Sequence, residues 1–169
     1  WSSDVCSSDL STSITAVNDA PVASGSTTLA EVLEDTVAPA GSLVSTLFGS
    51  NFSDSTDAVT NGSVANTFVG VAITANAATA AQGKWQWLNG STWTDISTSL
   101  SDTGALYLTT GTSVRFMPSA NYNGTPGTLT ARLVDSSATG LINGTAYNVS
   151  TNGGSTAYSS ATVSLSTSI

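Results

Sequence analysis

The chain has 169 residues, of which 40% are hydrophobic and only 8% are charged, and its formal net charge is −8. A length of this order favours one domain with a real core, and the hydrophobic share argues against disorder. The only basic residues, Lys84, Arg115 and Arg132, form no basic stripe, which argues against nucleic-acid binding.

The composition also removes several kinds of chemistry. Histidine is absent and Cys6 is the single cysteine, so the chain lacks the residues for disulfides, for zinc sites built on Cys or His, and for Ser-His-Asp catalysis. No apolar run reaches the length that a membrane-spanning helix needs. Oxygen ligands are the metal-binding groups that remain in any number.

The first segment, "WSSDVCSSDL" at residues 1–10, matches no targeting signal, because it carries two aspartates and no basic residue. The codons TGG AGT TCA GAC GTG TGC TCT TCC GAT CTN spell the same decapeptide and resemble the end of a sequencing-library adapter. We therefore expect residues 1–10 to be an artefact tail, and we assign Cys6 no function.

Short β-rich runs separated by turn signals occupy the rest of the chain. Asn-Gly pairs at Asn61, Asn89, Asn123 and Asn143 mark turns. Runs rich in β-branched, aromatic and alternating apolar residues predict strands. The expected strands are residues 27–33, 67–75, 84–88, 92–96, 105–108, 113–117, 128–134, 146–150 and 156–168. No stretch has helical periodicity, so the sequence predicts an all-β fold, an antiparallel β-sandwich.

The run "KWQWLNGSTWTDI", residues 84–96, holds three of the four tryptophans around a hairpin turn. A two-residue turn at Asn89-Gly90 would put Trp93 on the face opposite Trp85 and Trp87, whereas a three-residue loop would put all three rings together. One interpretation is that these rings fill the core, and the other is that they form an exposed sugar-binding platform.

The most specific stretch is "ITAVNDAPV" at residues 14–22. The motif "STSI" leads into it at residues 11–14 and recurs at residues 166–169, 155 residues later. The stretch "ITAVNDAPV" resembles the junctions in giant bacterial surface adhesins, which are built from tandem repeats of the cadherin-like, VCBS-type and Ig-like classes. The motifs "LEDT", "FSDSTD", "RFMPSANYNG" and "LTARLVD" resemble the same repeats. The resemblance implies an Ig-like or cadherin-like sandwich from a tandem array, with an inter-repeat junction at 11–22 and the sandwich repeat at 23–169.

Acidic residues dominate the first half of the chain, where no Lys or Arg precedes Lys84. If the fold gathers them at one end, a divalent cation would relieve their repulsion, and calcium takes six to eight oxygen ligands. The run from Asp54 lacks EF-hand spacing, so separate loops must assemble such a site. The alternative is that these residues merely keep a weakly charged surface soluble.

A candidate calcium site follows from this pattern. "VNDAP", residues 17–21, resembles the calcium-binding linker of cadherins, although Ala16 stands where that linker has its first Asp. We expect Glu34 and Asp35 to lie beside Asp54, while the junction residues meet a neighbouring repeat. The expected ligands are Asn18, Asp19, Glu34, Asp35, Asp54, Asp57 and Asp135.

The leading functional hypothesis is a non-enzymatic structural and adhesive module of a long bacterial cell-surface or secreted adhesin, stiffened by calcium at its junctions. Its expected partners are neighbouring repeats of the same chain and a surface ligand or glycan, with no nucleic acid and no direct membrane insertion. A carbohydrate-binding module that uses Trp85, Trp87 or Trp93 is the alternative, and it requires an exposed aromatic pair. A hydrolase would require two carboxylates in a cleft.

Overall fold

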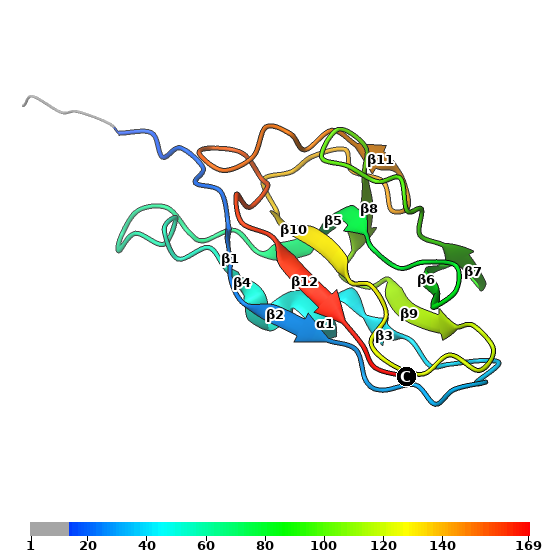
Figure 1. Cartoon of the computed structure of the whole chain (residues 1–169). Helices are drawn as coiled ribbons and strands as arrows, with labels where there is room; N and C mark the ends of the chain where they lie inside the picture. The colour runs from blue at the N-terminus through cyan, green and yellow to red at the C-terminus, as the bar shows by residue number, and fades with distance from the viewer. Residues whose placement is uncertain (1–13) are drawn as a thin grey trace, which may run out of the picture.

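The computed structural model describes residues 14–169 (Figure 1). The expected artefact tail at residues 1–10, with Cys6, lies outside the described residues, and so does the start of the junction at residues 11–13. Within the described part, the chain is mostly β-structure, and two antiparallel sheets pack face to face as a sandwich. The all-β sandwich predicted from the sequence is confirmed.

The larger sheet has six strands in the order β11-β8-β5-β10-β12-β2. These are β11 (Ala146–Tyr147), β8 (Ala105–Thr109), β5 (Phe68–Asn76), β10 (Leu129–Asp135), β12 (Val163–Ser166) and β2 (Ser26–Thr28). All neighbours in this sheet are antiparallel except β12 and β2, which are parallel. The central strands β5 and β10 pair along their whole length, from Asn76 opposite Leu129 to Phe68 opposite Asp135. The register shifts at two places along this pairing.

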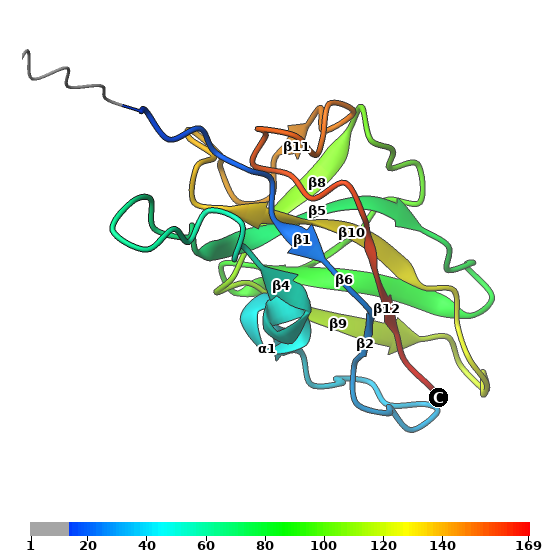
Figure 2. The same cartoon turned by 90° about the vertical axis from the view of Figure 1, so that its left-hand side faces the viewer.

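The smaller sheet has four strands in the order β3-β9-β6-β7, and a separate two-stranded ribbon joins β1 to β4. These are β3 (Ser42–Leu43), β9 (Ser113–Pro118), β6 (Gly83–Asn89), β7 (Thr92–Asp95), β1 (Val22–Ala23) and β4 (Phe52–Ser53). The ribbon lies next to α1 (Val44–Phe48) and the 3-10 helix η1 (Gly49–Asn51) in Figure 2.

The core between the sheets follows from period-two alternation in the central strands. Val71 and Ile73 of β5 and Leu133 of β10 are buried on the inner face, and Trp85 and Phe116 face them from the smaller sheet. The Trp85 and Phe116 rings meet edge to face, with their centroids 5.1 Å apart. Such aromatic contacts add stability beyond their buried area.

The outer face of the larger sheet is also covered. Ala72, Tyr107 and Val134 form a second buried cluster, and residues from the long irregular segment 136–162 pack over them. Figure 1 shows this segment running over β8 and β10 on its way to β12. Both faces of β10 are buried, and the strand is mostly apolar; its charged residues, Arg132 and Asp135, are buried as well.

The turn of the tryptophan hairpin lies one residue later than the expected Asn89-Gly90 turn. Asn89 pairs with Thr92, so Gly90 and Ser91 form a two-residue turn and Trp93 stands opposite Leu88. Trp93 therefore lies on the face opposite Trp85 and Trp87, as a two-residue turn requires. The interpretation of these rings as core residues is right for Trp85 and Trp87, which are buried, while Trp93 is half-buried on the outside of the sheet.

Three expectations about local structure are corrected. The expected strands 27–33 and 156–168 shorten to β2 and β12, because each is paired over only three to four residues. The expected strand 146–150 shortens to β11 in the same way. The helix α1 was not expected, yet it buries Val44, Leu47 and Phe48 at the spacing of one helical face. No helix within residues 14–169 is long and apolar enough to cross a membrane.

Candidate cation site at the amino-terminal end of the sandwich

Four aspartates from separate segments gather where the chain enters the sandwich. Asp54 directly follows β4, Asp57 lies in the next turn, Asp135 is the last residue of β10, and Asp19 lies in the segment that leads to β1. Burial raises the pKa of Asp54, and the negative charges of the other three residues add to that rise. We call these four residues the aspartate cluster.

Asparagine side chains and backbone N–H groups tie this cluster together. Asn66 donates from its backbone N–H to Asp54 Oδ2 at 2.5 Å, and from its side-chain Nδ2 to Asp57 Oδ2 at 3.1 Å and to Asn18 Oδ1 at 2.6 Å. The backbone N–H of Asp19 donates to Asp57 Oδ1 at 3.0 Å. The lead-in segment and the loop 55–66 are therefore joined at the cluster itself.

Two carboxylate oxygens in the cluster are buried without a hydrogen-bond partner. Asp54 is 5% exposed and its Oδ1 is unpaired, while Asp135 is fully buried and its Oδ2 is unpaired. The other oxygen of Asp135 accepts hydrogen bonds from the backbone N–H and the hydroxyl of Ser137, at 2.7 and 2.6 Å. Buried polar atoms are nearly always paired, so these two oxygens are places where a proton, a water molecule or a cation would be bound.

The electrostatics agree with this interpretation. Burial raises the pKa of Asp54 above its ordinary value, the hydrogen bond from the Asn66 N–H opposes that rise, and the charges of Asp57, Asp135 and Asp19 add to it. No Lys or Arg is among the causes of this shift. The nearby basic residue Arg132 is committed to Asp102 and to backbone carbonyls.

The carboxylate oxygens of the cluster do not point to one common position where an ion could sit. Within residues 14–169, no three acidic side chains are drawn together as closely as the ligands of a bound ion. We attribute this spacing to the N–H donors of Asp19 and Asn66, which hold both oxygens of Asp57 and one of Asp54. The charges of Asp57, Asp135 and Asp19 nevertheless each act on Asp54.

The structure separates Glu34 and Asp35 from this cluster, which corrects the expectation that they lie beside Asp54. After β2 the chain continues along β12, where Leu29 donates to Ser166 O and Val32 donates to Ser168 O. Glu34 Oε2 accepts a 3.4 Å hydrogen bond from Asn123 Nδ2, and the adjacent Gly124 pairs with Ile169 at the carboxyl terminus, which Figure 1 shows beyond the end of β12. There Asp35 Oδ1 accepts a 2.9 Å hydrogen bond from the N–H of Asn121.

Of the expected ligands, the structure thus brings together Asn18, Asp19, Asp54, Asp57 and Asp135. Asn66 belongs to the same group and was missed from the sequence. The only signal for it was its place in the loop that begins with Asp54 and Asp57 and ends at β5.

The tryptophans do not form an exposed pair. Trp85 and Trp87 are buried, and Trp85 Nε1 donates to Gly127 O at 2.8 Å. The guanidinium of Arg115 lies over the Trp93 ring, 4.2 Å from its centroid, and also donates to Gln86. One face of the most accessible ring is therefore already covered by protein.

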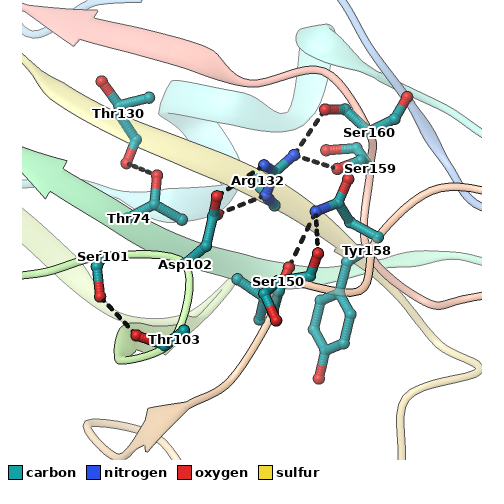
Figure 3. Close-up of polar contacts among 12 residues, drawn as sticks. Thr74, Ser101, Asp102, Thr103, Thr130, Arg132, Ser150, Tyr158, Ser159 and Ser160 are labelled. Carbon is teal, nitrogen blue, oxygen red and sulfur yellow. Dashed lines mark hydrogen bonds and ion pairs between the residues drawn. The ribbon is translucent and has the colours of Figure 1, made fainter.

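A second polar network lies beside the irregular segment and is structural. Arg132 donates to both oxygens of Asp102, at 2.9 and 3.1 Å, and to the carbonyls of Ser159 and Ser160, at 3.0 and 2.6 Å (Figure 3). The hydrogen bonds from Arg132 to the Asp102 carboxylate lower the pKa of Asp102. Because every partner of the guanidinium is protein, the network fastens the segment 136–162 to β10.

Comparisons with protein-family models, with curated proteins and with solved structures found no match to this chain. The functional argument therefore rests on the aspartate cluster and on the sequence motifs around it.

Proposed function

We propose that this protein is a structural repeat module of a bacterial cell-surface or secreted adhesin, and that the aspartate cluster binds calcium where one module joins the next. The observation that carries the proposal is the pair of buried, unpaired oxygens of Asp54 and Asp135 within a group of four carboxylates. A divalent cation would pair both oxygens and offset the mutual repulsion of the four charges.

Calcium fits the available donors better than other common metals. The chain outside residues 1–10 has neither cysteine nor histidine, which are the usual zinc ligands. The donors come from loops and a strand end, and calcium accepts such irregular sets of carboxylate, amide and carbonyl oxygens, whereas magnesium demands a near-ideal octahedron. Candidate donors besides Asp54 and Asp135 are Asp57, Asp19 and Asn18.

The mechanical effect of a bound ion follows from which segments the cluster joins. Asn18 and Asp19 belong to the incoming chain, while Asp54 and Asp135 are anchored by β4 and β10. An ion shared by these residues would fix the direction in which the preceding chain leaves the sandwich. It would also add folding free energy, because the unfolded chain does not hold the ligands together.

The adhesin assignment is supported by the junction-like run at residues 14–22, the recurrence of "STSI" and the β-sandwich fold. It implies an extracellular location and neighbouring repeats as partners. We propose no catalytic role, because the hollow next to the cluster is lined by Asn18, Asp57 and Asn66 and not by Asp54 or Asp135.

The proposal is tested by thermal unfolding of the full chain with calcium and with a chelator. At a calcium concentration of about 100 times the dissociation constant, the expected gain is about 2.7 kcal/mol, or a rise in the unfolding midpoint of roughly 5–10 °C. Asp54→Asn is expected to remove most of that rise, whereas Glu31→Gln, an exposed acidic residue away from the cluster, should leave it intact. An identical midpoint in calcium and chelator would refute the calcium site.

A further inference from the structure

Exposed apolar side chains concentrate at the two ends of the sandwich. Among residues 14–169, nine large hydrophobic side chains are exposed, and six of them belong to segments at the two ends. At the amino-terminal end these are Ile14, Val17, Val59 and Val64, and at the carboxyl-terminal end they are Leu33 and Val37. Large exposed apolar groups that cluster in this way mark interaction surfaces.

The amino-terminal group lines an open hollow next to the aspartate cluster. Ile14 and Val17 from the lead-in segment and Val59 from the loop 55–66 form its apolar wall, and Asp19 and Asp57 lie at its margin. We call it the amino-terminal hollow. Val17 is 71% exposed and Val59 is 57% exposed, so an apolar group that entered the hollow would remove a large area from water.

The carboxyl-terminal group is a rigid projection. Thr36 donates from its backbone N–H and its hydroxyl to Leu33 O, at 3.3 and 2.7 Å, and Asp35 adopts a left-handed φ of 62° to close this turn. Leu33 and Val37 stand out of the turn, 75% and 84% exposed. The turn 33–37 is thus a preformed apolar knob.

The two features must meet if successive units are joined through the "STSI" motif. The motif makes Ile169 of one unit equivalent to Ile14 of the next. Val17 is three positions after Ile14, which limits the span between them to about 11 Å. Leu33 follows Val32, whose N–H donates to Ser168 O at 3.1 Å, so the knob lies beside the point where the next unit starts.

We propose that the knob formed by residues 33–37 docks into the amino-terminal hollow of the following copy of this domain. The inference rests on the proposed tandem arrangement. Docking brings Glu34 and Asp35 toward Asp19 and Asp57 of the next copy, so it is repulsive unless a cation sits between the units. Contact between the apolar groups and neutralisation of these charges therefore reinforce each other, and the joint is tight only when both are present.

The test uses a two-unit chain in which Ile169 of the first unit is followed by Thr15 of the second. Leu33→Ser in the first unit removes the knob from the joint, and the same change in the second unit is the matched control because no unit follows it. Val59→Ser is placed in the second unit, with the first unit as its control. Since both side chains are exposed, neither change threatens the fold of a unit.

With calcium present, each change at the joint is expected to lower the unfolding midpoint by roughly 2–4 °C more than its control, and the two together should be less than additive. Small-angle scattering should show a longer two-unit particle after either joint change. Equal effects at joint and control positions would overturn the docking inference. Calcium stabilisation of the single-unit chain, measured in parallel, decides the cation site separately, because it requires no second unit.

Discussion

Asp54 and Asp135 are the residues on which the functional argument depends. A buried carboxylate without a partner destabilises a fold by several kcal/mol unless it is protonated or paired with a cation. No basic side chain among the described residues pairs with them: no Lys or Arg precedes Lys84 in the sequence, and Arg132, three residues before Asp135, bonds to Asp102 and to backbone carbonyls. The cluster is therefore expected to be stabilised either by protonation or by a cation, and protons and the cation should compete for the same oxygens.

In chelator, the free energy of unfolding is expected to rise as the pH falls from neutrality through the raised pKa of Asp54. The native state then takes up a proton more readily than the unfolded chain, whose aspartates titrate near 3.8. With saturating calcium the order reverses, because protons compete with the ion and the calcium-dependent stabilisation shrinks as the pH falls. Urea unfolding at about pH 7 and about pH 5 measures both trends.

Asp54→Asn is the control for this pH response, since it cannot titrate and should flatten the rise seen in chelator. Stability that falls steadily from neutral pH in chelator, equally in both proteins, would contradict the assignment of the shift to Asp54. The contributions of Asp95 and Asp102 do not interfere, because their lowered pKa values keep them ionised until the pH falls below about 3.8.

The two ion pairs found within residues 14–169 provide a contrast between buried and exposed sites. The Arg132 side chain is 11% exposed and has four hydrogen bonds to protein, whereas Lys84 is 61% exposed and has one, to Asp95. Arg132→Met should lower the free energy of unfolding by about 2–4 kcal/mol, because it leaves the carbonyls of Ser159 and Ser160 without donors. Lys84→Met should change it by less than about 1 kcal/mol. Equal losses in chemical denaturation would contradict this ranking.

Sequence reasoning found the acidic residues but not their arrangement. The absence of basic partners before Lys84 indicated Asp54 and Asp57 as candidates, and Asp135 was a candidate because it ends a predicted strand. The placement of Glu34 depended on how far the chain follows β12 after β2, and this pairing is parallel and distant in sequence. Non-local pairings of this kind leave no local pattern, so the sequence alone could not separate the two acidic groups.

Strands with strong alternation were predicted nearly to their ends, and weakly patterned elements were not. The expected strands 67–75 and 84–88 differ by one residue at each end from β5 and β6. The short strands β1, β3 and β4 have only two residues each, which is too few to produce a period. The helix α1 is a single turn held by tertiary burial, so its sequence carries almost no helical signal.

The irregular segment 136–162 is fitted to the sheets at particular glycines. Gly144 has a φ of 77°, and a Cβ at this position would collide with the buried indole of Trp87. Gly140 has a φ of 72° and open space around it, so a Cβ there would meet no atom and would only strain the backbone. Gly144→Ala should therefore cost roughly 2–4 kcal/mol of stability and Gly140→Ala about 1–2 kcal/mol. Denaturant unfolding with indole fluorescence measures both, and equal costs would show that Trp87 moves aside freely.

The two ends of the domain carry similar side chains but differ in shape. One end holds the aspartate cluster and the amino-terminal hollow, and the other holds Glu34, Asp35 and the apolar knob next to the carboxyl terminus. A hollow at one end and a projecting turn at the other are what the proposed head-to-tail joint requires. The fold class and the β-rich runs were predictable from the sequence, whereas this division into two ends was not.

Calorimetric titration of calcium into the chelator-treated full chain tests the role of the aspartate cluster most directly. The account predicts saturable binding, at least about tenfold weaker binding in Asp54→Asn and in Asp135→Asn, and nearly unchanged binding in Glu34→Gln. Circular dichroism of each variant shows whether it is folded, so that a loss of binding can be assigned to the ligand. An absence of saturable heat in the unmodified chain, or equal affinity in all four proteins, would contradict the account.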